Sequence, residues 1–432
     1  MSTALLTDHY ELTMVNAARA SGRADRACVF EVFARRLPEG RRYGVVAGTA
    51  RLLDAIEEFR FHQSELSFLL ERGIVTEDTA EWLASYRFTG TIRGYREGEL
   101  YFPGSPVLVV EGGFAEAVIL ETVILSVLNY DSAVAGAASR MVQAADNRPL
   151  IEMGARRAHE RSAVSAARAA YIAGFDATSN LEAGRVFGIP TRGTAAHSFT
   201  LVHESEEEAF RSQVSAMGTG TTLLIDTYNI EEGVKTAIQV AGTSLGAVRI
   251  DSGDLSVVVS QVREQLDRLG ATSTKIIVTN DLNEYTIASL RGSPVDVFGV
   301  GTSVVTGSGA PAAGFVYKLV ARTSDSGEWV SVAKKSSHKS NPGGKKSAVR
   351  ALQRGVATEE IVLVGQSTAV DGRELLHPLM VEGVRQDERS EAELTLTARE
   401  HHRIAIAELP GSAFSLQSGD PVIPTRFLSA DS

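Results

Sequence analysis

The chain has 432 residues, which is more than one small core requires and predicts either two domains or one barrel with a sizeable additional domain. Its 43 basic and 53 acidic residues give a formal net charge of -10, which argues against a general nucleic-acid or membrane-surface binder and leaves local anion sites open. The single cysteine, Cys28, excludes an intrachain disulfide and a cysteine-based zinc cluster, and we interpret it as a small apolar core residue.

The N-terminus shows no targeting pattern. It lacks a basic segment and reaches a charged residue at Asp8, and elsewhere no apolar run approaches the length that crosses a bilayer. We therefore expect a soluble, unexported, cytoplasmic protein, and the near absence of cysteine agrees with a reducing compartment.

The first third of the chain predicts a mixed α/β region. Thr7 or Asp8 can cap free backbone amides, so a helix is expected to begin there, with Tyr10 in its first turn. Further along we expect a strand at 27–33, helices at 47–61 and 63–72, short β segments within 91–111, and a long, mostly apolar segment at 115–141 that packs between domains or subunits.

From Pro149 onward, strand-like and helix-like segments alternate. Each apolar strand ends in Asp, Asn, Ser, Thr or Gly just before a helix begins, and the clearest strands are at 222–225, 247–250, 275–278 and 296–300. Both a βα barrel and a doubly wound sheet place ligands at the carboxyl ends of their strands. We favour the barrel because the polar ends recur on successive strands. This alternation stops beyond about Lys318, and the remainder is expected to return to the N-terminal domain.

One stretch of small residues, Gly193 to Phe199, surrounds a histidine. A turn at 188–190 precedes it and a β-branched, apolar run at 199–202 follows it, so His197 is expected on or beside a strand that emerges from a loop. Its small neighbours leave the imidazole room to approach a ligand. The alternative is a core histidine that bonds to a backbone carbonyl.

Carboxylates follow two of the predicted strands. Asp226 and Asp251 stand several residues before the next helix, where they can hold Mg²⁺ or stabilise a cationic sugar centre. Helix capping is the alternative, and Asp254 is the simplest cap because it directly precedes Leu255.

The remaining motifs are weak. Residues 299–302 offer backbone amides that suit a phosphate, but they lack the third glycine of a dinucleotide fingerprint and the Gly-Lys-Ser/Thr of a nucleoside-triphosphate loop. His159 and Glu160 lack the second histidine of a metalloprotease motif. The lysine-rich segment 334–346 is expected to be a solvated loop, with a phosphate-facing flap as the alternative.

Six segments in a fixed order carry a resemblance to a known family. Over nearly its full length the chain resembles nicotinate phosphoribosyltransferases. The matching segments are Thr7 to Met14, Glu152 to Arg157, Thr178 to Asn180, Gly193 to Phe199, Arg249 to Asp254 and Gly299 to Ser303.

The resemblance implies a fold and a reaction. The fold is an irregular, TIM-like α/β barrel at 116–334, with a smaller α/β domain formed by 1–115 and completed by 335–432. The implied reaction converts nicotinate and phosphoribosyl pyrophosphate to nicotinate mononucleotide and pyrophosphate in NAD salvage. ATP is a co-substrate, hydrolysed to ADP and phosphate through a phosphohistidine, and Mg²⁺ accompanies the phosphates. The implied assembly is a homodimer with shared active sites, without nucleic-acid or membrane partners.

The resemblance also assigns roles to residues. His197 is the phosphorylated histidine, Tyr10 stacks on the pyridine from a neighbouring subunit, and Asp226 and Asp251 face the ribose. Further substrate contacts fall to Met153, Arg156, Asn180, Thr194 and Arg249, and phosphate contacts to Ser252, Gly253, Asn280, Gly299, Gly301 and Thr302, with no protein metal ligand.

The chemistry of the residues agrees with these roles. Nicotinate is a flat anion, so an aromatic face, a cation and hydroxyl donors suit it. Many relatives place an aromatic residue where this chain has Met153, so one side of the ring sandwich is expected to be a thioether. Related nicotinamide enzymes carry an aspartate in place of Asn180, which would repel a carboxylate, so asparagine favours the acid.

Two alternatives stay open at this point. A nicotinamide- or quinolinate-using phosphoribosyltransferase belongs to the same class, and quinolinate calls for more cationic side chains around the ring. A non-catalytic phosphohistidine carrier or nucleotide sensor belongs to another class. Retention of both Asp226 and Asp251 counts against the carrier, which has no sugar cation to stabilise.

Overall fold

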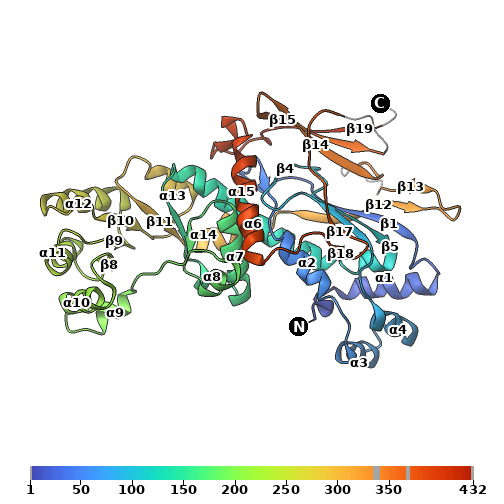
Figure 1. Ribbon diagram of the computed structural model, residues 1–432, viewed down its shortest axis with the longest axis horizontal. Helices are drawn as coiled ribbons and strands as arrows, with labels where there is room; N and C mark the ends of the chain where they lie inside the picture. The colour runs from blue at the N-terminus through green and yellow to red at the C-terminus, as the bar shows by residue number, and fades with distance from the viewer. Residues whose placement is uncertain (1, 334–340, 366–369, 430–432) are drawn as a thin grey trace. The chain divides into compact units, whose positions relative to one another are not determined.

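The computed structural model describes residues 2–333, 341–365 and 370–429. The described chain divides into two compact units (Figure 1). The first combines the residues up to Gly136 with those from Ala310 onward, and the second runs from Ala137 to Gly309. The domain limits expected from the sequence, 116 and 334, differ from the limits of these compact units and stay a proposal.

The first unit contains helices and three sheets. Its helices are α1 (His9–Ala20), α2 (Thr49–Glu57), α3 (Gln63–Glu71), α4 (Glu77–Ser85), α5 (Phe114–Val118) and α15 (Glu391–Ala407). Its strands are β1 (Ala27–Ala34), β2 (Gly44–Val45), β3 (Thr91–Gly94), β4 (Leu100–Tyr101), β5 (Leu108–Gly113), β12 (Phe315–Thr323), β13 (Trp329–Ser331), β14 (Lys346–Gln353), β15 (Val356–Val364), β16 (Arg373–Glu374), β17 (His377–Val381), β18 (Val384–Arg385) and β19 (Thr425–Ser429).

The largest sheet of this unit draws strands from both ends of the chain. Its order is β13-β12-β1-β5-β3-β17-β18, with antiparallel pairing between neighbours. The interior strand β1 is buried along almost its whole length and carries Cys28, which is 1% exposed, as its interpretation as a core residue requires. Strand β12 pairs with β1, so residues 315–323 belong to this sheet. A smaller sheet has the order β16-β14-β15-β19, and β2 pairs with β4.

Helix α1 begins where the sequence predicted. The Asp8 backbone N–H donates to the Glu11 carboxylate at 3.1 Å, and Leu12, Val15 and Ala18 are buried at helical spacing. Tyr10 lies in the first turn and is 47% exposed.

Helix α6 (Glu121–Ala145) is the longest helix and runs through the boundary between the units. The segment Phe114–Ala145 contains a window of mean hydropathy 1.5, long and apolar enough to cross a membrane by length and composition, which corrects our expectation that no run approaches that length. Because 67% of this window is buried inside the fold, we interpret the segment as a core helix.

The second unit alternates short strands and helices. Its strands are β6 (Leu150–Glu152), β7 (Ala177–Thr178), β8 (Thr222–Leu224), β9 (Ala247–Ile250), β10 (Lys275–Val278) and β11 (Val297–Val300). Its helices are α7 (Glu160–Ile172), α8 (Leu181–Phe187), α9 (His197–Leu201), α10 (Glu206–Met217), α11 (Ile230–Ala241), α12 (Leu255–Arg268), α13 (Glu284–Ser289) and α14 (Thr302–Val305).

All six strands of this unit pair in parallel, in the order β7-β6-β11-β10-β9-β8. Strands β8 to β11 confirm the four clearest strands that the sequence predicted. Over the described residues, β7 and β8 end the strand order and do not pair with each other, so the structure establishes a mixed α/β fold with a parallel sheet. The closed, TIM-like barrel stays a proposal.

The histidine stretch differs from its expected conformation. His197 begins helix α9, and the run at 199–202 that was expected to be a strand lies in the helix and its cap. The Val202 N–H donates to the Ser198 carbonyl at 3.2 Å, a helical bond. The expectation was wrong because β-branched residues favour strands through packing on a neighbouring strand, and α9 sits between a loop and α10 without one.

Candidate active site

The carboxyl ends of the parallel strands gather a set of polar side chains. Asp226 follows β8, Asp251 follows β9 and Thr279 follows β10. Because parallel strands end at one edge of the sheet, residues from three separate stretches of chain meet there. The structure joins six of the predicted site residues through hydrogen bonds and close contacts, and these are Thr194, His197, Asp226, Arg249, Asp251 and Ser252.

Asp226 ties two strand ends together. Its Oδ2 accepts hydrogen bonds from the Asp251 backbone N–H at 2.8 Å and from the Ser252 hydroxyl at 2.6 Å. Its Oδ1 is buried without a hydrogen-bond donor among the described residues and lies 3.8 Å from His197 Nε2. Asp226 is therefore no helix cap, and it presents a desolvated carboxylate oxygen to the imidazole.

His197 is held by side chains and stays accessible. Its Nδ1 lies 3.1 Å from the Thr227 hydroxyl, and its side chain is 40% exposed. This environment differs from the core histidine considered as the alternative. An imidazole with a carboxylate on one side and solvent access on the other has the arrangement of an activated nucleophile.

Arg249 anchors the histidine stretch to the strand ends. Its Nη1 donates to the Thr194 hydroxyl at 2.8 Å and its Nε to the Thr279 hydroxyl at 2.9 Å. Its Nη2 lies 3.2 Å from Asp251 Oδ2, while Thr279 donates to Asp251 Oδ1 at 2.7 Å. The Arg249 side chain is only 11% exposed. A largely desolvated guanidinium beside threonine hydroxyls can recognise a planar carboxylate.

Two residues of this site, Thr279 and Glu206, were not predicted from the sequence. Thr279 had a readable signal, since it directly follows β10 as Asp251 follows β9. Glu206 begins α10 and is the first of three successive glutamates. Because acidic residues are typical of a helix start, the sequence did not distinguish Glu206 from its neighbours. Burial and the Asp226 charge raise the pKa of the Glu206 carboxyl to about 7, and its Oε1 is buried without a hydrogen-bond donor over the described chain.

Close packing explains why residue 299 is a glycine. A Cβ atom added to Gly299 would lie 2.8 Å from Met153 Sδ and 2.6 Å from Thr279 Cγ2, so the thioether lies directly against β11. Next to Met153, the buried Glu152 accepts from the Thr178 hydroxyl at 2.6 Å, and burial raises the pKa of its carboxyl. Gly299 is thus required for packing, whether or not it also contacts a phosphate.

Two of the residues singled out from the sequence, Asn180 and Asp254, cap helices. The Asn180 amide oxygen accepts from the Ala183 N–H at 3.0 Å at the start of α8. Asp254 accepts from the Ser256 N–H at 3.2 Å at the start of α12, which confirms the cap that its place before Leu255 predicted.

The structure does not bring the remaining predicted residues into this hydrogen-bonded cluster. Tyr10 lies in the first unit, where burial and the Glu121 carboxylate raise the pKa of its phenol. The rest are Arg156, which is exposed, together with Gly253, Asn280, Gly301 and Thr302, and their ligand roles stay predictions.

The comparisons with known proteins place the chain in a family. Residues 5–129 match the family model of the nicotinate phosphoribosyltransferase (NAPRTase) N-terminal domain. The chain is 54% identical to nicotinate phosphoribosyltransferase pncB1 of Mycobacterium tuberculosis, covering 99% of this chain and 95% of that protein. It is 38% identical to the nicotinate phosphoribosyltransferase of Bacillus subtilis, over 80% and 72% of the two chains.

Solved structures agree in fold. The crystal structure of human nicotinic acid phosphoribosyltransferase superposes with a TM-score of 0.80 at 24% identity, covering 98% of this chain and 97% of that one. Nicotinate-nucleotide pyrophosphorylase from Pyrococcus furiosus gives 0.76 at 22% identity, covering 93% and 95%. The chain thus has the fold of these pyridine-nucleotide enzymes. By its sequence identity to the bacterial relatives, it belongs to the nicotinate phosphoribosyltransferase family.

Proposed function

We propose that this protein transfers a phosphoribosyl group from phosphoribosyl pyrophosphate to nicotinate, with release of nicotinate mononucleotide and pyrophosphate, as a cytoplasmic step of NAD salvage. The observation that carries the proposal is the cluster at the strand ends. His197 stands beside the buried Asp226 oxygen, and Thr194 of the same stretch is bonded to Arg249.

ATP hydrolysis is coupled to the transfer through His197. The lone pair of a neutral imidazole nitrogen attacks the γ-phosphorus of ATP, a nitrogen–phosphorus bond forms, and the bond to the ADP oxygen breaks. The ring keeps its proton on the other nitrogen and becomes cationic, and the Asp226 carboxylate stabilises that cation. Water later cleaves the nitrogen–phosphorus bond and releases phosphate.

Nicotinate binds beside Arg249. The guanidinium and the Thr194 hydroxyl contact its carboxylate, Met153 and Asn180 line the ring site, and Arg156 stands at its rim. Tyr10 of the partner subunit stacks on the other face of the ring in a homodimer with shared active sites. The side chains that support this arrangement from within one chain are Thr279 and Asp251, which fix the guanidinium plane.

The sugar phosphate binds at the strand ends. Asp226 and Asp251 face the ribose and stabilise positive charge at its reacting carbon. Phosphate groups are bound by Ser252, Gly253, Asn280, Gly299, Gly301 and Thr302. The described residues include no group of three or more His, Cys, Asp or Glu side chains that could hold a metal. In the proposed reaction, Mg²⁺ arrives with the substrate phosphates.

We also propose a two-domain architecture for this protein. Residues 116–334 form an irregular, TIM-like barrel that carries the site, and residues 1–115 with 335–432 form the smaller domain. The parallel pairing of β6 to β11 supports the barrel, and the pairing of β3 with β17 supports a domain built from both chain ends.

A product assay tests the reaction class. The protein is given phosphoribosyl pyrophosphate and Mg²⁺ with nicotinate, nicotinamide or quinolinate, with and without ATP, and the mononucleotide is identified by mass. We expect nicotinate mononucleotide as the main product and a higher yield with ATP. If none of the three pyridines gave a product, the proposed enzyme activity would be excluded. A preference for nicotinamide or quinolinate would exclude nicotinate as the substrate.

A further inference from the structure

A cavity lies within the first unit, whereas the strand ends that carry the proposed active site belong to the second unit. Its volume is about 560 Å³, and its lining residues come from α2, the loop between β3 and β4, β17, β18, α15 and the loop between β18 and α15. This volume falls within the range of sites that hold small organic molecules. None of the residues assigned to phosphoribosyl transfer lines it.

Among the described residues, most of the charged side chains that line this cavity have a bonding partner, but Arg96 does not. Arg389 is bonded to Asp387, with Nη2 to Oδ2 at 2.5 Å, and Arg385 is bonded to Asp54 at 2.5 Å. The Glu97 carboxylate accepts from the Gly48 N–H. No hydrogen bond or ion pair joins the exposed Arg96 side chain to any residue within the described ranges. Arg96 therefore contributes a positive charge without a partner.

Two imidazoles lie near this arginine. Burial lowers the pKa of His377 and the Arg96 charge adds to this effect, while Glu374 acts in the opposite direction. An anion bound beside Arg96 would pair with its charge, and the His377 imidazole can donate a hydrogen bond to the same anion.

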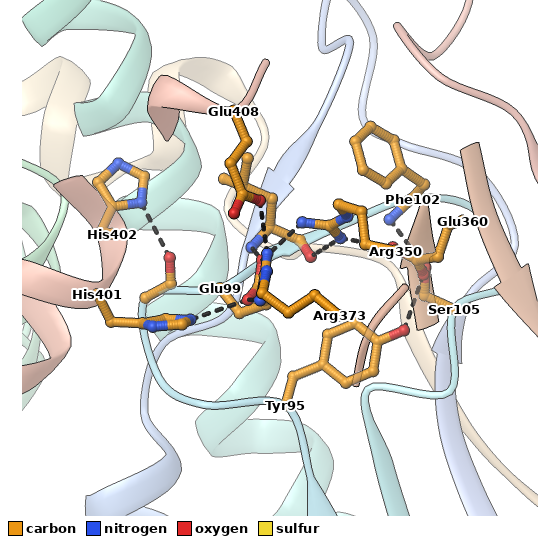
Figure 2. Close-up of polar contacts among 12 residues, drawn as sticks. Tyr95, Glu99, Phe102, Ser105, Arg350, Glu360, Arg373, His401, His402 and Glu408 are labelled. Carbon is orange, nitrogen blue, oxygen red and sulfur yellow. Dashed lines mark hydrogen bonds and ion pairs between the residues drawn. The ribbon is translucent and has the colours of Figure 1, made fainter. Parts of the chain in front are cut away.

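The wall that carries His401 is rigidly held. His401 Nε2 lies 2.8 Å from Glu99 Oε2, and Glu99 is bound by Arg350 at 2.6 Å and by Arg373 at 2.5 Å (Figure 2). Arg350 is fully buried and also bonds to Glu360 at 2.5 Å. This buried network fixes one side of the cavity before any ligand arrives, which lowers the cost of ordering on binding.

Part of the lining is apolar, since it includes Leu53, Leu379 and Leu394. We propose that this cavity binds a small organic anion with a flat body, whose phosphate or carboxylate contacts Arg96 and His377 and whose ring packs on the leucines. Two sources share this chemistry, a nucleoside monophosphate and an aromatic carboxylate. The site lies outside the proposed catalytic cluster, so the ligand acts as an effector and not as a reactant.

Calorimetric titration of the full-length protein tests the site. The probes are AMP, nicotinate, inorganic phosphate and uncharged adenosine. Either AMP or nicotinate is expected to show a binding event that weakens at least about tenfold in Arg96→Ala, since hydrogen bonds to charged groups contribute about 1.5–3 kcal/mol. The same event is expected to disappear in Thr397→Trp, which fills the cavity from an exposed position of α15.

Two controls separate this event from binding at the catalytic cluster. Arg354→Ala removes an equal charge from an exposed position outside the cavity and is expected to leave the event unchanged. Arg249→Ala alters the proposed active site in the second unit and should also leave it unchanged. The proposal is overturned if neither AMP nor nicotinate binds outside the active site, or if the event survives both Arg96→Ala and Thr397→Trp.

Discussion

Asp226 shows how one buried side chain serves both the fold and the site. One carboxylate oxygen holds the backbone of Asp251 and the hydroxyl of Ser252, while the other faces His197. Removal of this carboxylate would therefore disturb the strand ends and the imidazole together. For this reason Asp226 is a poor position for separating catalysis from stability, and its neighbours offer cleaner tests.

The Glu206 carboxyl offers such a test, because its titration should make the stability of the protein depend on pH. Its folded-state pKa of about 7 lies above the ordinary value of 4.5, because burial and Asp226 disfavour the charged form. Between these two pH values the unfolded chain releases the proton while the folded chain keeps it, so this group makes stability fall as pH rises through the window. Glu206→Gln cannot ionise, and we expect it to be more stable than the wild type at pH 8.

The measurement is urea denaturation of both proteins from pH 4.5 to pH 8, across the window that these two pKa values define. We expect the stability difference to grow with pH and to vanish near the lower end. A constant difference across this range would show that Glu206 does not titrate there.

Asn180 tests substrate choice without loss of its structural role. Its amide oxygen caps α8, and aspartate caps a helix equally well, so Asn180→Asp is expected to fold normally. Because a carboxylate repels nicotinate and accepts from an amide, the variant should lose more kcat/KM for nicotinate than for nicotinamide. Steady-state kinetics with equal losses for both pyridines would remove Asn180 from the specificity argument.

Among the elements, β11 is restricted by close packing at one residue. A methyl group at Gly299 would meet the Met153 sulfur and the Thr279 methyl carbon at less than van der Waals distance. Overpacking of this kind costs about 1–3 kcal/mol. Gly299→Ala should therefore lower the free energy of unfolding by that amount, and the loss should be smaller when it is introduced into Met153→Ala than into the wild type. Chemical denaturation of both variants checks this, and a Gly299→Ala protein as stable as the wild type would contradict the packing argument.

The elements also show what sequence reasoning can reach. Strands β8 to β11 were predicted because buried parallel strands are continuous apolar runs, and the starts of α1 and α12 because Asp8 and Asp254 precede helical periodicity. Helix α9 was not predicted because its residues favour strands. They form a helix here because, among the described residues, no neighbouring strand is available for them to pair with. Thr279 and Glu206 were missed because their proximity to Asp251 and Asp226 depends on tertiary structure.

At the scale of the whole chain, the lysine-rich segment shows a further limit of sequence reasoning. Residues 334–340 lie outside the described residues. Beyond them, Lys346 is buried and bonds to Glu31 at 2.7 Å, and Lys345 bonds to Glu111 at 2.8 Å. These two lysines hold the C-terminal segment to strands β1 and β5, whereas a solvated loop was expected. A charge run alone does not reveal that a carboxylate on a distant strand faces it.

The buried network around Glu99 predicts the acid stability of the protein. Burial alone would raise the pKa of Glu99, but Arg350, His401 and Arg373 outweigh it and hold this pKa well below 4.5. The network therefore stabilises the fold fully above pH 4.5 and less as pH falls toward the folded-state pKa. Glu99→Gln should lose about 3 kcal/mol at pH 7, because it leaves buried arginine charges without a partner.

Denaturation of Glu99→Gln and the wild type at pH 7 and at pH 3.5 checks this prediction. The stability difference between them is expected to shrink at the lower pH. Equal differences at both values would show that Glu99 does not contribute to the acid transition.

The claim on which the account depends is that ATP phosphorylates His197. The direct measurement is to incubate the protein with ATP and Mg²⁺, to map the phosphoryl group by mass spectrometry, and to follow nucleotide formation in His197→Ala. We expect an acid-labile, alkali-stable phosphoryl group on His197 of the wild type. The variant should lose stimulation by ATP and keep some ATP-independent transfer. A phosphoryl group on another residue, or full ATP stimulation in His197→Ala, would contradict the account.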